Sequence, residues 1–367
     1  MKIGLLGFGF MGKTHAYAIN NLKFFYRDLP FHAEIAAVCT PHAESAAAAG
    51  EFLDCDCYTD TQEMLSRDDI DIIDICTPNI YHYEEIIAAL RAGKHIYCEK
   101  PLCVTYEQAS EAARLAREKG LICQVVFNNR FLAPIMRAKE LIDAGEIGRV
   151  ISFRSSYLHS SATDANRAAG WKQDKDICGG GVLFDLGSHA ADLIYYLCGR
   201  FSSVRGRAQI AYPERLGRDG KKWHTNADEA FYMIAELECG AVGTVEASKI
   251  ALGTNDDLRV EIYGSCGALR FDLMEPNWLY FYDGKAPCSD MGGKRGFTRI
   301  ECVGRYPLPG GTFPGAKAPV GWLRGHLGSM YSYLDCVSRG ARPQPSFDDG
   351  AHIQWVLERA YESAGLL

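Results

Sequence analysis

The feature that most constrains this 367-residue chain is a glycine pattern near its start. A short apolar run at 2–6 leads into Gly7-Phe8-Gly9-Phe10-Met11-Gly12, and a helical pattern follows at 13–21. Glycines at this spacing between a strand and a helix permit a tight turn, close approach of a pyrophosphate and tight packing of the helix on its strand. The pattern therefore predicts that residues 7–12 contact the phosphates of a dinucleotide.

The next hundred residues alternate between apolar runs and helical patterns. Further buried strands are predicted at 33–39, 71–76, 95–98 and 121–127, and the clearest helices at 83–92 and 106–119. Strands that alternate with helices form a parallel sheet with helices on both faces. Residues 1–126 are therefore predicted to form a doubly wound Rossmann domain that binds NAD or NADP.

The loop after the second predicted strand bears on the choice of nucleotide. An acidic residue usually stands there and accepts hydrogen bonds from the ribose 2′-hydroxyl of NAD. Here the strand runs into Thr40-Pro41-His42 instead. Thr40 can hydrogen-bond a hydroxyl without repelling a 2′-phosphate, although these residues can equally serve only as a turn. The sequence thus favours NAD slightly and does not exclude NADP.

Two more strand ends carry polar residues suited to a nucleotide site. The strand at 71–76 runs into Thr77-Pro78-Asn79, followed by His82, and the strand at 95–98 runs into Glu99-Lys100-Pro101. Ligands of open α/β sheets bind at the carboxyl ends of the strands. These residues are therefore candidates for cofactor contact, although a lysine in such a loop can also be only a solvated charge.

Beyond residue 126 the pattern changes to strands joined by turns and irregular loops. Strands are predicted at 150–157, 204–211, 230–238, 241–250, 259–263 and 279–282. Such a succession is typical of a largely antiparallel sheet. The chain is therefore predicted to be an α/β protein in which residues 127–367 form a C-terminal α+β domain with a large, mostly antiparallel open sheet. A last helix at 350–363 can pack back on the first domain.

A triple glycine followed by three titratable side chains lies between the first two of these strands. Gly179-Gly180-Gly181 precedes Asp185, His189 and Asp192, whose spacings of four and three residues would place them on one face of a helix. A histidine beside a carboxylate is a common device for moving protons. The same pair can also exist only to satisfy a buried histidine, so both interpretations stay open on the residues alone.

Charge and cysteine content exclude several kinds of partner. The chain has 39 basic and 46 acidic residues, a net charge of −7, which is the wrong sign for binding along nucleic acid. No apolar run reaches the ~20 residues that span a membrane. The 14 cysteines are too sparse for a disulfide scaffold and lack the paired spacing of a zinc site. A cytoplasmic protein without a bound metal is therefore expected.

Together these motifs resemble one family, the Gfo/Idh/MocA oxidoreductases. The resemblance covers essentially the whole chain and rests on the glycines at 7–12, Thr77-Pro78-Asn79 with His82, Glu99-Lys100-Pro101, and Gly179-Gly180-Gly181 with Asp185 and His189. The sequence departs from the family pattern at Thr40, where many members that use NAD have an aspartate. The departure bears on cofactor choice and leaves the rest of the resemblance intact.

The resemblance implies an NAD(P)-dependent oxidoreductase that transfers a hydride between the nicotinamide and a secondary hydroxyl of a sugar, cyclitol or glycoside, with C3 of a pyranoside as a candidate position. It implies that Lys100 and His189 are the acid–base residues, either of which can be the base, and that Asp185 places the substrate or the histidine. A redox-neutral, NAD-dependent glycoside hydrolase or lyase that acts through a 3-keto intermediate is the alternative. A non-catalytic nucleotide-binding sensor is less favoured, because a sensor needs no proton-transfer residues.

Other side chains are candidates for contact with a carbohydrate, and each can also be explained by packing. They are Tyr157, His159, Trp171, Trp322, Arg324 and His326. The expected assembly is a dimer or tetramer of identical chains.

Overall fold

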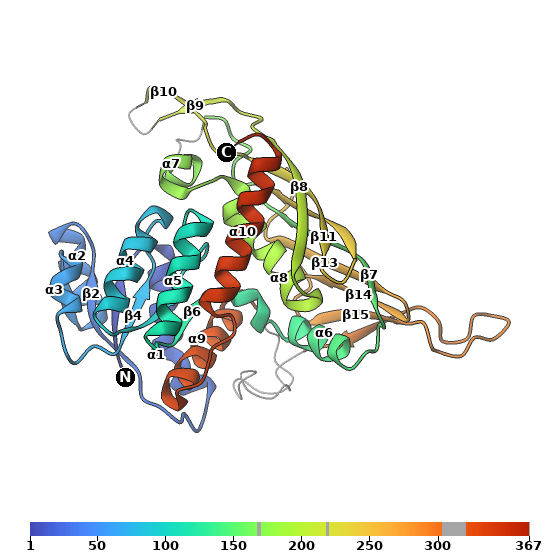
Figure 1. Ribbon diagram of the computed structural model, residues 1–367, viewed down its shortest axis with the longest axis horizontal. Coiled ribbons are helices and arrows are strands. Elements are labelled where there is room, and N and C mark those ends of the chain that lie inside the picture. Colours follow the sequence, from blue (N-terminus) through green and yellow to red (C-terminus); the bar gives the residue numbers. More distant parts are fainter. Residues whose placement is uncertain (167–169, 218–219, 303–320, 367) are drawn as a thin grey trace. The chain divides into compact units, whose positions relative to one another are not determined.

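The computed structural model describes residues 1–166, 170–217, 220–302 and 321–366, which form two compact units. Of these residues, unit 1 contains 1–128 and 322–354, and unit 2 contains 129–166, 170–217, 220–302, 321 and 355–366. Figure 1 shows that each unit is built around its own sheet, with the strands of unit 1 in blue to cyan and most of those of unit 2 in green to orange. The two units are therefore described one at a time.

The sheet of unit 1 is parallel. In the part of the chain that the structure describes, its six strands follow the order β3-β2-β1-β4-β5-β6. They are β1 (Lys2–Leu6), β2 (Glu34–Cys39), β3 (Asp56–Tyr58), β4 (Ile72–Ile75), β5 (His95–Cys98) and β6 (Cys123–Val125). The chain changes direction across the sheet between β1 and β4, which is where open α/β sheets bind ligands at their carboxyl ends. The predicted doubly wound domain is confirmed.

The helices of unit 1 cover this sheet. They are α1 (Phe10–Phe25), α2 (Ala43–Leu53), α3 (Thr61–Leu65), α4 (Asn79–Arg91), α5 (Tyr106–Glu118), α9 (Trp322–Arg339) and the first part of α10 (Phe347–Ser363). Helix α9 comes late in the chain and packs against α1. The Tyr26 and Tyr331 rings stack there with centroids 4.1 Å apart, and both side chains are buried. Residues from both ends of the chain thus build the core of unit 1.

The main sheet of unit 2 is mixed and mostly antiparallel. Within the described ranges its eight strands follow the order β16-β15-β14-β13-β7-β12-β11-β8. They are β7 (Val150–Leu158), β8 (Phe201–Gln209), β11 (Ala230–Leu237), β12 (Val242–Ser248), β13 (Asp257–Gly264), β14 (Gly267–Asp272), β15 (Trp278–Asp283) and β16 (Phe297–Glu301). Strands β7 and β12 are parallel neighbours, and the other neighbours are antiparallel. This confirms the predicted open sheet.

One face of the large sheet is covered by helices α6 (Ala133–Asp143) and α8 (Ser188–Cys198) (Figure 1). Along β11, Phe231 and Met233 point to this face and are buried, whereas Tyr232 and Ile234 alternate with them and are exposed. Alternation of this kind is the mark of a sheet with one covered face. Smaller elements complete unit 2: a hairpin of β9 (Glu214–Leu216) and β10 (Lys222–His224), the 3₁₀ turns Asn128–Phe131 and Trp171–Gln173, α7 (Lys175–Cys178) and a π-helical turn at Leu183–Gly187. None of the helices within the described residues combines the length and apolar character needed to span a membrane.

Candidate active site

The glycine-rich turn joins β1 to α1 at the carboxyl end of the sheet of unit 1. Gly7 has a φ of +85°, in the left-handed region that favours glycine, and a Cβ on Gly12 would lie 2.2 Å from the Gly7 carbonyl oxygen. A Cβ on Gly9 would meet no heavy atom of the described residues within 4 Å, its chain neighbours apart. Gly7 and Gly12 are therefore required by the turn itself, whereas Gly9 borders open space in front of the first turn of α1.

Aromatic side chains surround this turn. The Phe8 ring lies 5.8 Å from that of Phe52, and the exposed Phe10 ring stacks on Trp322 of α9 with centroids 5.9 Å apart. Trp322 in turn contacts His326, whose ring centroid is 4.3 Å away. The turn and the start of α9 thus form one cluster.

His326 and Arg324 lie in different surroundings although both belong to the start of α9. His326 is buried, and neither of its ring nitrogens has a hydrogen-bond partner among the described residues. Burial, with the charges of His15 and Lys100, lowers the pKa of His326 to about 3. The Arg324 guanidinium instead lies over the Phe25 ring, 4.7 Å from its centroid. Of the predicted pair, His326 is thus the one beside the glycine-rich turn.

Thr40 follows β2 directly and is buried. Its hydroxyl lies 2.7 Å from the Ser45 hydroxyl, and its N–H donates to the Tyr58 carbonyl at 3.1 Å. His42 is exposed and stands before the first residue of α2. These contacts hold the loop in place. Because residue 40 is a threonine, this end of β2 has no carboxylate at that position.

The loops after β4 and β5 are tied together by a histidine. The ring nitrogens of buried His82 lie 2.9 Å from the Thr77 carbonyl oxygen and 3.0 Å from that of Pro101. The Thr77 hydroxyl donates to Glu85 at 2.5 Å, and burial raises the pKa of Glu85 to about 7. His82 therefore connects the two loops, and its role is to hold the neighbouring residues in position.

Glu99 and Lys100 stand at the end of β5. The buried Glu99 carboxylate accepts the main-chain N–H of Lys100 at 3.1 Å. Burial alone would raise the pKa of Glu99, but a hydrogen bond from His15 and the positive charges of His15 and Lys100 lower it to about 2. An ionised carboxylate is thus held next to the lysine that the motif singles out.

In unit 2, polar side chains gather where β7 and β12 end side by side. The parallel register pairs Ser248 with Leu158, so the two strands end at the same edge of the sheet. The Tyr157 hydroxyl donates to Asp256 at 2.6 Å, and His159 Nε2 lies 3.0 Å from the same carboxylate oxygen. The Tyr157 ring meets the His189 ring nearly edge-on, with centroids 5.9 Å apart. Tyr157, His159 and His189 thus form one cluster around Asp256.

Asp185 is held by two lysines. Lys172 Nζ lies 2.8 Å and Lys249 Nζ 3.0 Å from its carboxylate oxygens, and Lys249 is buried. Lys172 also lies near the ring of Trp171, 5.7 Å from its centroid, so Trp171 belongs to the same region. The carboxylate therefore carries a positive partner on each side.

Of the three residues expected on one face of an α-helix, only His189 and Asp192 lie on the same α-helix, α8. Asp185 lies in the π-helical turn before α8, which breaks the α-helical spacing between Asp185 and His189. Asp192 is buried and accepts two hydrogen bonds from the Arg130 guanidinium, one of 2.8 Å from Nε. Asp192 is thus a structural ion-pair partner.

Sequence reasoning missed three charged residues of the unit 2 cluster, namely Lys172, Lys249 and Asp256. Lys249 directly follows β12, and a charged residue at the end of a half-buried strand could have been recognised in the sequence as a candidate site residue. Lys172 lies in the 3₁₀ turn at Trp171–Gln173 and Asp256 in the loop before β13, and only the folded chain shows that they reach the cluster.

The triple glycine is fixed by Asp228. The buried Asp228 carboxylate accepts N–H groups of Gly181 and Leu183, both at 3.0 Å, and the Tyr361 hydroxyl. Burial raises the pKa of Asp228. A Cβ on Gly181 would lie 2.2 Å from the Asp228 carbonyl oxygen, so glycine is required where the two segments meet.

Asp228→Asn should lower the free energy of unfolding by about 2 kcal/mol, because the new NH₂ group faces N–H donors and leaves at least one of them unsatisfied. Denaturant titration measures the change. Asp290→Asn makes the same chemical change at an exposed position and should stay within about 0.5 kcal/mol of the wild type. Equal stability of the two variants would contradict the role given to Asp228.

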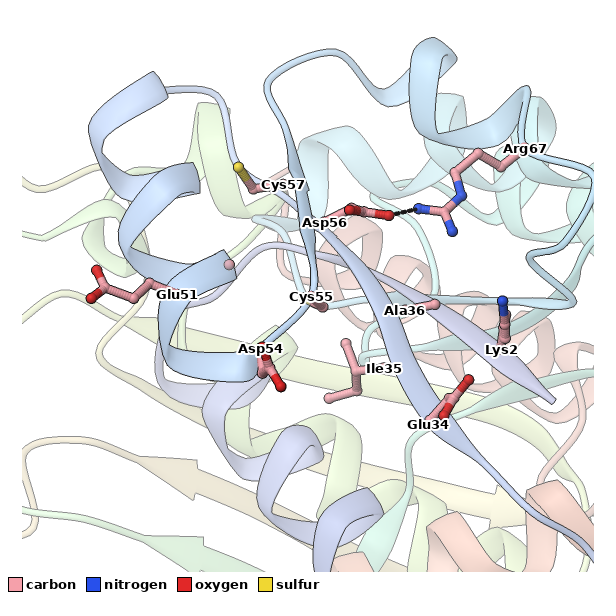
Figure 2. Close-up of a pocket in the computed structure, with 11 residues that line it drawn as sticks. Lys2, Glu34, Ile35, Ala36, Glu51, Asp54, Cys55, Asp56, Cys57 and Arg67 are labelled. Atoms are coloured by element: carbon pink, nitrogen blue, oxygen red, sulfur yellow. Dashed lines mark hydrogen bonds and ion pairs between the residues drawn. The ribbon is translucent and has the colours of Figure 1, made fainter.

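A groove elsewhere in unit 1 is not part of this site (Figure 2). It is lined by residues at the amino ends of β1, β2 and β3, including Lys2, Glu34 and Asp56. Its cations are paired: Arg67 with Asp56 at 2.6 Å, drawn as a dashed line, and Lys2 with Asp69 at 2.8 Å. The groove lies at the opposite end of the strands from the glycine-rich turn, so we assign it no role in nucleotide binding.

Comparison with known proteins finds relatives of both parts of the chain. Residues 1–127 match an oxidoreductase family with an NAD-binding Rossmann fold, and residues 135–270 match the GFO/IDH/MocA C-terminal domain. Levoglucosan dehydrogenase of Pseudarthrobacter phenanthrenivorans is 32% identical over 99% of this chain and 96% of its own length. The scyllo-inositol 2-dehydrogenase (NAD(+)) of Bacillus subtilis is 31% identical over 79% of each protein.

A solved structure shows the same likeness. Levoglucosan dehydrogenase in complex with NADH and levoglucosan superposes with a TM-score of 0.94, at 30% identity, over 100% of this chain and 97% of that one. Both halves of the sequence and the arrangement of its elements therefore agree with the resemblance stated above. The chain belongs to the Gfo/Idh/MocA family of oxidoreductases.

Proposed function

We propose that this protein uses NAD to oxidise a secondary hydroxyl of an anhydrosugar or a related pyranoside or cyclitol. The observation that carries the proposal is the match along the full chain to an enzyme solved with NADH and levoglucosan. Both sets of residues that the reaction needs are present: Lys100 in unit 1, and Asp185 and His189 in unit 2. A sensor would need neither set.

Unit 1 would hold the cofactor. The space beside Gly9 and the absence, among the described residues, of a side-chain cap or acidic residue in the first turn of α1 leave room and N–H groups for a pyrophosphate. Contacts along residues 7–12 would bind the phosphates, Thr40 the ribose, and the loops at 77–82 and 99–100 the nicotinamide half. When bound, the nicotinamide accepts the hydride.

His189 and Lys100 would act on the same substrate oxygen. Oxidation of an alcohol requires that the hydroxyl lose its proton as the hydride leaves carbon. We assign the proton to His189 and a hydrogen bond to the same oxygen to Lys100. Tyr157, His159, Trp171, Trp322 and His326 are the side chains that we propose for contact with the sugar.

The test is a panel of sugars with purified protein and NAD. Levoglucosan, scyllo-inositol and methyl β-D-glucoside should be compared by the rate of NADH formation, and the keto-sugar identified by NMR. We expect at least one of the three to be oxidised, with a 3-keto product for the pyranosides. If NADH forms with none of these sugars, the proposed substrate class is wrong.

A redox-neutral glycosidase is the second candidate, and one observation favours it. A 3-ketone makes the C2 proton acidic, and removing that proton requires a further acid–base group, which His159 and Asp256 can supply. Protein that carries bound NAD would then release the aglycone of an aryl glycoside over many turnovers without added nucleotide, with solvent deuterium at C2. Release only in proportion to added NAD would leave the dehydrogenase as the function.

Thr40→Asp should weaken NADP binding by about 10-fold or more and leave NAD binding equal or better. A carboxylate at this strand end repels a 2′-phosphate and can accept hydrogen bonds from the ribose hydroxyls. Titration of both reduced nucleotides by fluorescence measures the two affinities. An equal loss for both nucleotides would show that Thr40 is not at the ribose.

We infer that the protein is a homo-oligomer, a dimer or a tetramer. The face of the unit 2 sheet opposite α6 and α8 carries Tyr232 and Ile234, which are 46% and 62% exposed. Arg205 of β8 lies opposite Ile234 in the pairing of β8 with β11. A second copy of this face would cover these side chains. Light scattering after size exclusion measures the mass, and a monomer at micromolar concentration would contradict the inference.

A cytoplasmic location is also proposed. All 14 cysteines are free thiols in the structure, which suits a reducing compartment. Fractionation of cells that express the native protein tests the location.

A further inference from the structure

A buried histidine of unit 1 joins the glycine-rich turn to the catalytic lysine candidate. His15 lies on α1, five residues after the helix begins, and is 1% exposed. Its Nδ1 lies 2.8 Å from an Asp74 carboxylate oxygen, and its Nε2 lies 3.1 Å from a Glu99 carboxylate oxygen. Asp74 and Glu99 are themselves buried. One imidazole therefore bridges two carboxylates, one on β4 and one directly after the neighbouring strand β5.

This geometry determines the protonation of His15. A neutral imidazole has one N–H and one lone pair, whereas ionised carboxylates only accept hydrogen bonds. Both ring nitrogens face carboxylate oxygens, so both must carry a proton for the two contacts to be hydrogen bonds. Burial opposes the charge, but the negative charge of Asp74 and its hydrogen bond with the ring raise the pKa of His15 well above its usual value. An imidazolium ion at His15 therefore satisfies both contacts.

The charges in this cluster do not cancel. Two carboxylates and one imidazolium leave a net charge of −1 in a buried environment, where charge interactions are screened less than in water. The other oxygen of Glu99 accepts the main-chain N–H of Lys100 at 3.1 Å, and the positive charge of the Lys100 side chain helps to lower the pKa of Glu99. The residual negative charge thus lies next to Lys100 and favours a cation there.

The remaining groups around His15 do not change this sum. Cys76 Sγ lies 3.1 Å from Nδ1, and burial raises the pKa of this thiol, so it is uncharged. The Tyr97 and His326 rings are 5.2 and 6.0 Å away. Burial raises the pKa of Tyr97 and lowers that of His326 to about 3, so both are neutral near pH 7.

We propose that His15 is a positioning residue for Lys100: it fixes the Glu99 carboxylate from α1, and the Asp74–His15–Glu99 cluster keeps Lys100 in its ammonium form during the reaction. Lys100 then donates a hydrogen bond to the substrate oxygen, and another group, which we assign as His189, accepts the hydroxyl proton. This inference rests on the proposed function only in so far as Lys100 takes part in the reaction. Because α1 begins at the glycine-rich turn, the same contact connects the phosphate-binding helix to the lysine.

The protonation of His15 can be measured without any activity. Long-range ¹H–¹⁵N NMR of ¹⁵N-histidine-labelled wild-type protein distinguishes imidazolium from neutral imidazole, and contacts with the Tyr97 ring assign the His15 signal. We expect the imidazolium signature to persist from pH 6 to pH 9. A neutral His15 ring at pH 7 would overturn the proposal even if the enzyme oxidises sugars normally.

Kinetics test the consequence for Lys100. His15→Gln should lower kcat about 10²-fold, with KM for NAD and sugar within about threefold of the wild type, because the lysine is misplaced while the binding surfaces remain. His95→Gln is the matched control, since His95 Nδ1 accepts the Ile122 N–H at the amino end of β5, far along the strand from Lys100. Equal kcat losses in the two variants would mean that His15 serves only to stabilise the fold.

The charge argument has its own variant. Glu99→Gln removes the negative charge next to Lys100 and keeps the side-chain shape, so the ammonium ion is less favoured. The basic limb of the kcat–pH profile should move to lower pH by about one to three units. An unchanged limb, with the wild type active, would overturn the role of the cluster. If no tested sugar is oxidised even by the wild type, the proposed substrate class fails, and the NMR measurement alone decides the state of His15.

Discussion

Lys100→Met should lower kcat by at least about 10²-fold while NAD affinity stays within about threefold of the wild type. Methionine has similar length but cannot donate a hydrogen bond to the substrate oxygen or carry a charge. Steady-state kinetics with the best sugar of the panel, together with NADH titration, separates the two effects. Lys94→Met is the control: it removes a buried lysine elsewhere in unit 1, whose Nζ donates to the Arg67 carbonyl at 2.7 Å.

His189→Ala should produce a loss of similar size, with exposed His224→Ala as its control. If Lys100 and His189 act on one hydroxyl, the double variant should lose much less than the product of the two single losses. Wild-type turnover in Lys100→Met would remove this residue from the mechanism. Independent, multiplicative losses would contradict action on a shared oxygen.

Gly9→Val should weaken NAD binding and leave stability almost unchanged, whereas Gly12→Ala should lower the stability of the fold. Gly9 has a φ of −79°, which other residues adopt, and its Cβ direction is open, so valine should change the free energy of unfolding by about 0.5 kcal/mol or less. The same valine should weaken NAD binding about 100-fold, because it occupies the space that a pyrophosphate needs.

Gly12→Ala should instead lower the free energy of unfolding by about 3 kcal/mol, since its Cβ would lie 2.2 Å from a backbone oxygen that has no room to move. Denaturant titration and calorimetric titration with NADH measure the two quantities for both variants. Unchanged NAD affinity in Gly9→Val would show that the phosphates do not lie beside this residue.

The parallel sheet of unit 1 could be predicted because its central strands are almost entirely apolar. Residues 72–75 and 96–98 are buried and lie between helices with clear patterns. Strand β3 was missed because it has three residues at the edge of the sheet, two of them exposed, and carries no apolar run. The strand-end motifs for the nucleotide followed from the same alternation, since parallel strands place their carboxyl ends at one edge.

The unit 2 cluster was harder to predict, for two physical reasons. The π-helical turn at 183–187 adds a residue to one helical turn, which the spacing of Asp185 and His189 does not reveal. The position of Lys249 beside Asp185 depends on the pairing of β12 with β7, whose partner residues are about 90 positions apart along the chain. Local patterns carry no information about contacts over that distance.

The central position of β7 also affects how unit 2 folds. Its two neighbours in the sheet, β12 and β13, are Val242–Ser248 and Asp257–Gly264, so about 260 residues must leave the ribosome before β7 can pair on both sides. Until β12 emerges, a strand with Phe153 and Tyr157 on its inner face has two unpaired edges, and until β13 emerges it keeps one. Nascent chains of this protein should therefore depend on chaperones that shield β7, and substitutions that weaken β12 should reduce soluble yield more than they reduce the stability of the folded protein.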